Sequence, residues 1–248
     1  GFEGFFHVVK PTGRPYTVVI DSLVGPVDSI QAGDEIGIFD GSTPVGVVVV
    51  DKNFISSKDN QHSLSFDGID DYVRIDESSL FDLNDFTFSA WVNVDADHDG
   101  WNTIIDIDND EQQLAIVSNT IGIYGRCGYI LGGSVSPGWQ HVAWTVSGLS
   151  YSIYVNGSKV SSGSGCSNGV DADRLMIGSG YDDQTEVFKG EIDEVQVWNR
   201  SLTQSELVST MGKSLAGQES GLIGYWNFSE GSGSNASDLT YNANNGLV

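Results

Sequence analysis

GEIDEVQVWNRSLTQSEL, the stretch from Gly190 to Leu207, decides how the rest of the chain is interpreted. Apolar and polar residues alternate in its first half, a period of two that predicts a strand. The expected faces are Ile192, Glu194, Gln196 and Trp198 on one side and Asp193, Val195 and Val197 on the other. The second half has a capping-box pattern at Thr203–Glu206, which predicts a short helix that ends at Gly212.

This stretch resembles the closing strand and helix of the laminin-G-like jelly rolls in the concanavalin A-like lectin/glucanase superfamily. Three further stretches resemble that family's motifs in the expected order: SLSFDGIDDYVRI (Ser63–Ile75), FTFSAWVNV (Phe86–Val94) and PGWQHVAWTVSGLSYSIYVNGSKV (Pro137–Val160). The resemblance implies that residues 59–248 form an all-β jelly-roll sandwich with one short helix. A fold of this kind does not by itself specify a ligand.

Residues 1–58 differ from the rest and predict a small β-rich N-terminal domain. Four strand-like runs, FFHVV, YTVVI, DEIGIF and VGVVVV, are separated by Pro and Gly. The run Ala32–Gly46 resembles a motif of small β-domains on bacterial surface proteins. The polar run Ser56–Gln61 is the expected linker between the two domains.

Acidic residues dominate the charge of the chain. Asp and Glu number 34 against 11 Lys and Arg, which gives a net charge of −23. Such a surface repels phosphate backbones, so nucleic acid and anionic membranes are not expected as partners. It favours divalent cations, although an acidic surface can also serve solubility in salty water. No run of 18 apolar residues occurs, so no membrane insertion is expected.

The setting predicted for the protein is extracellular or at the cell surface. The chain begins at Gly1 without a signal peptide or initiator Met, and we expect a processed or excised piece of a longer exported protein. Cys127 and Cys166 flank the central hairpin, and a disulfide between them is plausible in an exported protein.

The first candidate calcium site follows the strand that ends at Val94. The spacing of the D-x-D-x-D-G-x5-E calcium loop is matched by Asp95, Asp97, Asp99, Gly100 and Asp106. Trp101, which follows Gly100, is also a candidate ligand. Asp replaces the final Glu, and a strand rather than a helix precedes the pattern. The alternative is a solvated hairpin tip.

The second candidate calcium site comes from the family resemblance. Many members carry a structural calcium held by an Asp of the closing strand and by the loop after the opening strand. The matching residues are Asp193 and, in the loop Asp67–Asp71, Asp67 and Gly68. Asp193 is expected on an apolar face, where a carboxylate needs a partner or a metal. The alternative is a carboxylate that is hydrogen-bonded by Arg74 or by a turn.

No catalytic residue is predicted, and the chain is not expected to be an enzyme. The superfamily includes glucanases, whose signature resembles E-[ILV]-D-x-x-E on one strand. Glu191 and Asp193 begin that pattern, but the second Glu position is Gln196, which cannot act as a general acid or base at neutral pH.

Sugar recognition by such a module requires aromatic platforms on loops or on an open sheet face. Four aromatic residues in or beside predicted loops are the candidates: Trp101, Tyr124, Tyr129 and Tyr181. The alternative is that these aromatics pack in the core, as most aromatic residues of the chain are expected to do.

The leading functional hypothesis is a non-catalytic, calcium-stabilised binding or adhesion module that recognises glycans or a cell-surface protein. The alternative is a structural subunit of an extracellular fibre or adhesin, in which copies of the chain exchange strands. The segment Gly221–Gly246 bears on both, because it resembles a segment that usually precedes a laminin-G-like domain. It either completes this jelly roll as an added strand or begins another copy.

Overall fold

The computed structural model describes residues 35–40, 43–49, 62–76, 83–95, 100–107, 112–167, 169, 174–180 and 186–248. The chain divides into two compact units, Gly1–Asp59 and Asn60–Val248. In the first unit, strands β1 (Glu35–Asp40) and β2 (Thr43–Val49) form an antiparallel hairpin. They correspond to the predicted runs DEIGIF and VGVVVV. The runs FFHVV and YTVVI and the linker Ser56–Gln61 lie outside the described residues.

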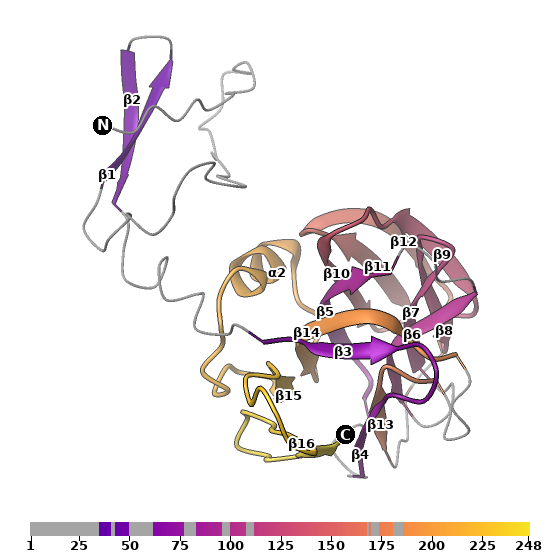
Figure 1. Ribbon diagram of the computed structural model, residues 1–248. Helices are drawn as coiled ribbons and strands as arrows, with labels where there is room; N and C mark the ends of the chain where they lie inside the picture. Colours follow the sequence, from indigo (N-terminus) through magenta and orange to yellow (C-terminus); the bar gives the residue numbers. More distant parts are fainter. Residues whose placement is uncertain are drawn as a thin grey trace. The chain divides into compact units, whose positions relative to one another are not determined.

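The second unit is a sandwich of two antiparallel sheets, as the sequence predicted (Figure 1). The seven-stranded sheet contains β3 (Leu64–Asp67), β5 (Phe86–Val94), β10 (Trp139–Ser147), β11 (Ser150–Val155), β12 (Ser158–Ser164), β14 (Lys189–Trp198) and β15 (Leu222–Trp226). The eight-stranded sheet contains β4 (Val73–Ile75), β6 (Trp101–Ile107), β7 (Gln112–Val117), β8 (Thr120–Gly125), β9 (Ile130–Ser134), β13 (Leu175–Ile177), β16 (Asn235–Ala236) and β17 (Gly246–Leu247). The second unit is therefore an all-β jelly-roll sandwich.

The main hydrophobic core lies between the two sheets. Alternate residues of each long strand point into it, as expected for a sheet with one buried face. The ring of Trp144 packs edge-on against Phe86 at 4.8 Å and against Phe88 at 5.7 Å between centroids. Aromatic pairs of this geometry add to the burial of apolar area, so these rings anchor the middle of the seven-stranded sheet.

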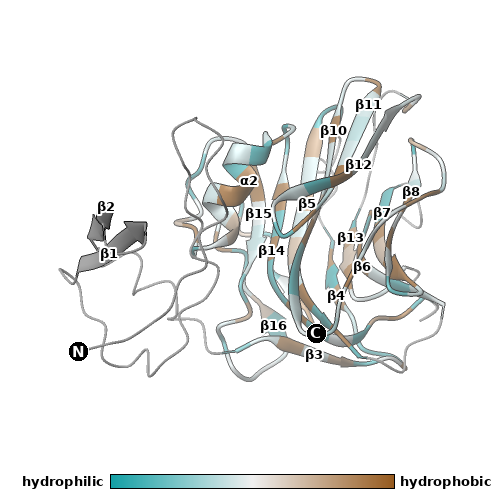
Figure 2. Cartoon of the chain, turned by 90° about the horizontal axis from the view of Figure 1, so that it is seen from above, coloured by the Kyte–Doolittle hydropathy of each residue, from teal (hydrophilic) through white to brown (hydrophobic). Residues whose placement is uncertain are grey.

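A helix covers part of the outer face of the seven-stranded sheet. Helix α2 (Gln204–Met211) begins with the predicted capping box of Thr203 and Glu206 and ends at Gly212. Figures 1 and 2 both place it beside β14, β15 and β5. A second apolar cluster includes residues of this sheet, of the helix and of the segments that flank it: Ala143, Tyr154, Trp198, Leu202, Leu207, Leu215, Leu222 and Tyr225.

A β-bulge interrupts strand β14 at its centre. Asp193 pairs with Trp91, and the next paired residue, Gln196, faces Ser89, so three steps along β14 oppose two along β5. Glu194, within the bulge, has a φ of +52°. An extra residue in one strand shifts the side chains that follow it to the opposite face.

The bulge corrects the faces predicted from the alternating sequence. Ile192, Val195 and Val197 all belong to the main core, although the pattern placed Ile192 opposite the two valines. Asp193, which pairs with Trp91 next to Ile192, lies on the other face. The prediction that Asp193 shares an apolar face with Val195 and Val197 is therefore wrong.

The two ends of the jelly roll share one edge of β14. Strand β3 pairs with Lys189–Ile192, and β15 pairs with Val195–Trp198, on either side of the bulge. Strand β17 then pairs with β4 in the other sheet through Leu247 and Arg74. The C-terminal segment therefore completes this jelly roll as an added strand, which was the first of its two predicted alternatives.

Candidate functional site

An exposed group of apolar side chains lies on the outer face of the eight-stranded sheet. We call Trp101, Tyr124, Tyr129 and Leu131 the aromatic patch. In β8 the neighbours Ile121 and Ile123 point into the core, so Tyr124 points outward. Tyr124, Tyr129 and Leu131 are 43%, 56% and 47% exposed, which is unusual for side chains of this size.

Two rings of the patch, one from the start of β6 and one from the turn before β9, meet on the sheet. The rings of Trp101 and Tyr129 are 5.4 Å apart between centroids and tilted by 35°. Gly122 makes room for them, because a Cβ at this position would lie 3.3 Å from Cη2 of Trp101 and 2.7 Å from a methyl of Val117. The indole therefore reaches Gly122 on β8, where a side chain would force Val117 to shift and would press on the indole.

The patch is longer than one ring. The indole of Trp101 extends from β6 to Gly122 on β8, and Gly122 pairs with Leu131 on β9, so the patch crosses three strand spacings. Three spacings between neighbouring strands amount to about 14 Å. The surface is thus an elongated platform on which more than one sugar ring can lie.

A covered polar network borders the patch. Gln113 pairs with Tyr124 in the sheet, and its Nε2 donates to Oγ1 of Thr103 and to Oε2 of Glu186, both at 2.8 Å. Gly180 lies directly above, since a Cβ there would be 2.4 Å from Nε2 of Gln113. Gly180 and Glu186 therefore cover the sheet at Gln113, and the exposed side chains of the patch lie on and beside β8 and β9.

The structure brings together three of the four aromatic residues predicted to bind a ligand. Trp101, Tyr124 and Tyr129 lie on one face, and Tyr181 lies outside the described residues. Leu131 and Gly122 were missed by the sequence analysis. The two residues pair directly in the sheet. Leu131 could have been identified from the sequence, because it stands two residues after Tyr129 and alternate residues of a strand point to the same face.

Three carboxylates gather in the loop after β3. Carboxylate oxygens of Asp67, Asp70 and Asp71 lie within 4.8 Å of one another. The loop is held by two hydrogen bonds, from the N–H of Ile69 to Asp67 Oδ1 at 2.7 Å and from the N–H of Asp67 to Asp71 Oδ2 at 2.8 Å. Gly68 has a φ of +80°, which suits the tight turn. Clustered carboxylates of this kind fit a hard cation such as Ca²⁺.

Asp193 does not lie beside this loop. Asp67 pairs with Lys189, four residues away from Asp193 along β14, a separation of about 13 Å. Asp193 Oδ1 instead accepts a hydrogen bond from the N–H of Glu194 at 2.8 Å, within the bulge. Arg74, named as the alternative partner, pairs with Asp76 at 2.7 Å.

The predicted Asp95–Asp106 calcium loop is only partly described. Asp95 is exposed and lies 3.7 Å from Nζ of Lys189. Asp97 and Asp99 lie outside the described residues, and Gly100 has a φ of +90°. Trp101 begins β6 and Asp106 lies buried within it, so the second half of the motif is strand rather than loop.

The acidic residues of the glucanase-like pattern belong to a hydrogen-bond network. The bulge places Glu191, Asp193 and Gln196 on the outer face of the seven-stranded sheet, the face on which α2 packs. Glu191 accepts hydrogen bonds from Ser63 Oγ at 3.0 Å and from Asn93 Nδ2 at 2.9 Å. Gln196 is buried, and its Oε1 accepts a bond from the indole of Trp198.

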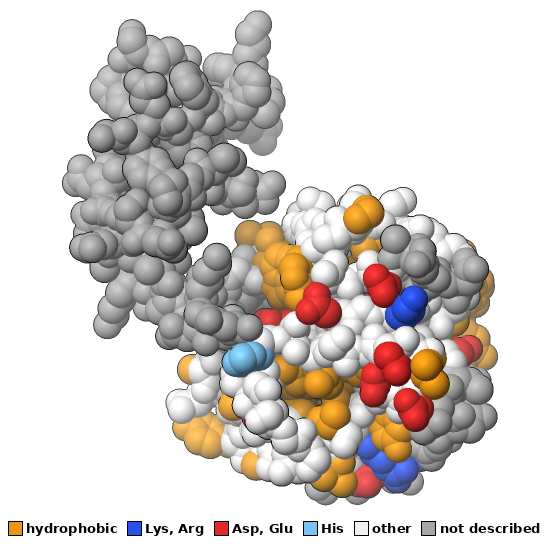
Figure 3. All heavy atoms as spheres, in the orientation of Figure 1, with side chains coloured by type: hydrophobic (Ala, Val, Ile, Leu, Met, Phe, Trp, Pro, Cys, Tyr) orange, Lys and Arg blue, Asp and Glu red, His pale blue; other side chains and the backbone are white. Residues whose placement is uncertain are grey.

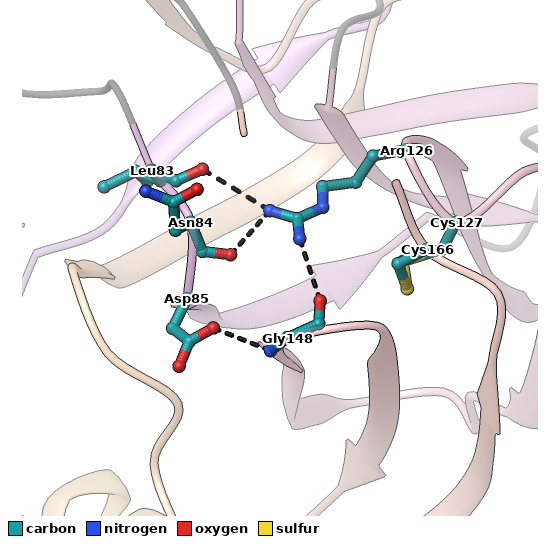
Figure 4. Close-up of a disulfide and its surroundings, with 7 residues drawn as sticks. All are labelled: Leu83, Asn84, Asp85, Arg126, Cys127, Gly148 and Cys166. Carbon is teal, nitrogen blue, oxygen red and sulfur yellow. Dashed lines mark hydrogen bonds between the residues drawn. A yellow bond between two sulfur atoms is a disulfide. The ribbon is translucent and has the colours of Figure 1, made fainter. Parts of the chain in front are cut away.

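A disulfide ties the turn that carries Tyr129 to the other sheet. Cys127 follows β8 and is bonded to Cys166, which follows β12 of the seven-stranded sheet (Figure 4). The N–H of Ser167 donates to the carbonyl of Arg126 at 2.8 Å. The covalent and hydrogen bonds together hold this end of the platform in place.

Arg126 beside the disulfide is turned inward. Its guanidinium donates to the carbonyls of Leu83, Asn84 and Gly148 (Figure 4), and Asp85 accepts the N–H of Gly148. Burial lowers the pKa of Arg126, and the nearby charge of Asp85 raises it. The cation therefore joins the turn after β8 to the segments at Leu83–Asn84 and Gly148.

A separate hollow lies where the two ends of the jelly roll meet. It has a volume of about 140 Å³, and Figure 3 shows apolar side chains exposed within a hollow on this face. Its lining comprises His62, Ser63, Leu64, Phe228, Glu230, Gly231, Ser232, Gly233, Asn235, Ala236 and Val248. The hollow is thus built from the start of β3 and the C-terminal segment.

Residues 67–208 match the model of a family described as the concanavalin A-like lectin/glucanases superfamily. A search of curated proteins found no match. Among solved structures, the chain is similar to a proposed carbohydrate-binding protein from Bacteroides ovatus, with 22% identity and a TM-score of 0.62 over 74% of this chain and 58% of that one. The chain thus spans little more than half of that protein's length.

Two further structures are similar at lower TM-scores. Domain 4 of the arabinanase AbnA from Geobacillus stearothermophilus, in complex with arabinotriose, has 20% identity and a TM-score of 0.49 over 59% of this chain and 75% of that one. The Ruminococcus gnavus sialidase module bound to α2,3-sialyllactose has 15% identity and a TM-score of 0.49 over 60% of this chain and 96% of that one. These likenesses concern the fold alone.

Proposed function

Because this chain belongs to the concanavalin A-like lectin/glucanase superfamily, we propose that its jelly roll is a non-catalytic module that binds glycans on the aromatic patch. The observation that carries the proposal is the exposure of Tyr124, Tyr129 and Leu131 around Trp101 on one open sheet face. Rigid aromatic rings offer apolar area to the C–H faces of sugar rings at low entropic cost.

The acidic residues of the glucanase-like pattern support a non-catalytic role. Glycoside hydrolysis uses two carboxyl groups on opposite sides of the scissile bond. In this chain Glu191 is held by Ser63 and Asn93, and the position of the second Glu is the buried Gln196. We expect no hydrolysis at this face.

We also propose that calcium stabilises the module through Asp67, Asp70 and Asp71. The support is the approach of their oxygens to within 4.8 Å in a short turn, where a divalent cation would relieve the repulsion between carboxylates. A bound ion would fix the loop between β3 and β4. Asp193 has no part in this site, because it lies at the other end of the pairing between β3 and β14.

An exported setting is part of the proposal. The Cys127–Cys166 bond is typical of oxidising compartments. Among the described residues, no helix has the length and apolar character needed to cross a membrane. The partner would be a glycan of a cell surface or an extracellular polymer. The pairing of the C-terminal segment within the same chain removes one of the features that favoured the alternative of strand exchange.

The test is glycan binding by variants of the patch. Calorimetry against a panel of polysaccharides should yield a ligand, and Trp101→Ala and Tyr129→Ala should each weaken its binding by roughly tenfold, about 1.4 kcal/mol. Tyr241→Ala is the matched control, since Tyr241 is 81% exposed and lies outside the patch. If Trp101→Ala lowers stability, Tyr129→Ala still tests whether the patch binds the glycan. Unchanged binding in both patch variants would overturn the assignment.

A further inference from the structure

The part of the chain that carries the aromatic patch has very little positive charge. From Ile75 to Ser158 the sequence contains one cation, Arg126, and eleven Asp and Glu residues. Strands β6, β7, β8 and β9 contain no Lys or Arg. An anion that binds on these four strands would therefore find no Lys or Arg side chain of the strands to neutralise it.

Arg126 cannot serve as an anion-binding group. Its side chain is buried, and its guanidinium donates to the main-chain carbonyls of Leu83, Asn84 and Gly148 (Figure 4). A ligand carboxylate could reach it only by breaking those bonds in a buried position, which would leave polar groups unsatisfied. A carboxylate, that of Glu186, is held by Gln113, which pairs with Tyr124 in the sheet.

The rim of the patch offers neutral hydrogen-bonding groups. Ser118 and Asn119 form the exposed turn between β7 and β8, and Thr120 pairs with the exposed Ser134 across β8 and β9. Hydroxyl and amide groups can both donate to and accept from sugar hydroxyls without imposing a charge. They border an apolar platform about 14 Å long, on which Tyr124, Tyr129 and Leu131 are exposed.

We propose that the patch binds an extended, uncharged polysaccharide along its length, rather than a terminal or an anionic sugar. This inference rests on the proposed function. It follows from the length of the platform, the exposure of its described side chains, the neutral rim, and the absence of Lys and Arg from strands β6–β9. Rings stacked on Trp101 and on Tyr129 would belong to the same chain, with a bend that follows the 35° between the aromatic planes.

The experiment compares neutral and charged ligands of increasing length. Calorimetry at low and at physiological salt would use neutral arabinan, xylan and β-glucan oligosaccharides of one to six residues, with sialyllactose and a sulfated polysaccharide alongside. Affinity for the neutral ligand should rise at least tenfold between one and three residues, and the anionic ligands should show no binding. Binding of an anionic glycan that Tyr129→Ala abolishes would overturn this inference but leave the proposed function intact.

Failure of every glycan to bind would overturn both proposals, so the two failures are distinguishable.

A variant that gains a positive charge provides a second test. Ser134→Lys places a cation on the exposed rim opposite Thr120, and should introduce measurable sialyllactose binding that weakens with salt. Ser134→Gln is the matched neutral control. Equal affinity of the two variants for sialyllactose would show that charge does not set the preference.

Discussion

The hydroxyl of Tyr225 on β15 donates a hydrogen bond to Oε2 of Glu194, the residue within the bulge of β14. The same hydroxyl accepts the N–H of Leu215 at 3.2 Å, so one phenol joins the bulge, the added strand and the segment after α2. Burial and the charge of Glu194 raise the pKa of Tyr225 above its usual value. The phenol therefore remains a hydrogen-bond donor over the whole range in which the protein is handled.

Tyr225→Phe should lower the free energy of unfolding by about 1–3 kcal/mol, because it leaves a partly buried carboxylate without its donor. Urea unfolding followed by tryptophan fluorescence measures this directly. Tyr241→Phe, at an exposed tyrosine, is the control and should change nothing. An equal, small effect in both variants would contradict the role given to the phenol.

His141 should make stability depend on pH. It lies on β10 in contact with the ring of Trp91, and burial lowers its pKa from 6.5 to about 4. The unfolded chain therefore binds the proton more readily, so the stability that neutral His141 contributes is present above pH 6.5 and is lost as pH falls toward 4. The total loss is on the order of 3 kcal/mol.

The pH dependence is measured by urea unfolding at intervals between pH 7 and pH 4. His141→Gln removes the titrating group, so the slope of stability against pH in this window should become shallower in the variant. Parallel slopes in the wild type and the variant would assign the pH dependence to carboxylates instead.

Calcium should raise the melting temperature through the loop after β3. At a calcium concentration of 100 times the dissociation constant, binding to the folded state alone adds about 2.7 kcal/mol. Asp70→Asn with Asp71→Asn should abolish the difference between calcium and EDTA, whereas Asp193→Asn should preserve it. Loss of the calcium effect in Asp193→Asn, or in Asp95→Asn alone, would move the site to that residue.

Reduction of the Cys127–Cys166 bond should destabilise the module. The bond closes a loop with a sequence separation of 39 residues, for which the entropy model gives about 4 kcal/mol. The double variant Cys127→Ser, Cys166→Ser should melt lower than the wild type and lose all sensitivity to dithiothreitol. An unchanged melting temperature would mean that Arg126 and its three carbonyl partners suffice to hold the loops.

The fold could be predicted because its signals are local and ordered. Family-like motifs predicted β5 and β10, alternation predicted β14, and the capping box at Thr203 predicted α2. The bulge could not be predicted in this way, because Glu194, despite its positive φ, fits the alternating sequence pattern like any other polar residue. Every face assignment after Glu194 depends on that single inserted residue.

The candidate sites were predicted less completely, for a related reason. Trp101 and Tyr129 were chosen because they flank loops, but their contact depends on the register of β6 to β9 and on the space over Gly122. Register also separates Asp193 from Asp67, which the family resemblance had paired. Contacts across strands are set by tertiary pairing, which no single stretch of sequence encodes.

The shared edge of β14 also bears on how the chain is synthesised. Until Leu222–Trp226 emerges from the ribosome, the half of β14 beyond the bulge has no neighbour on that side, although β3 has long been available for the other half. A nascent chain would then expose an unpaired strand and the apolar surface that Trp226 and Phe228 later cover. Premature termination before Leu222 should therefore yield aggregates rather than a smaller soluble module.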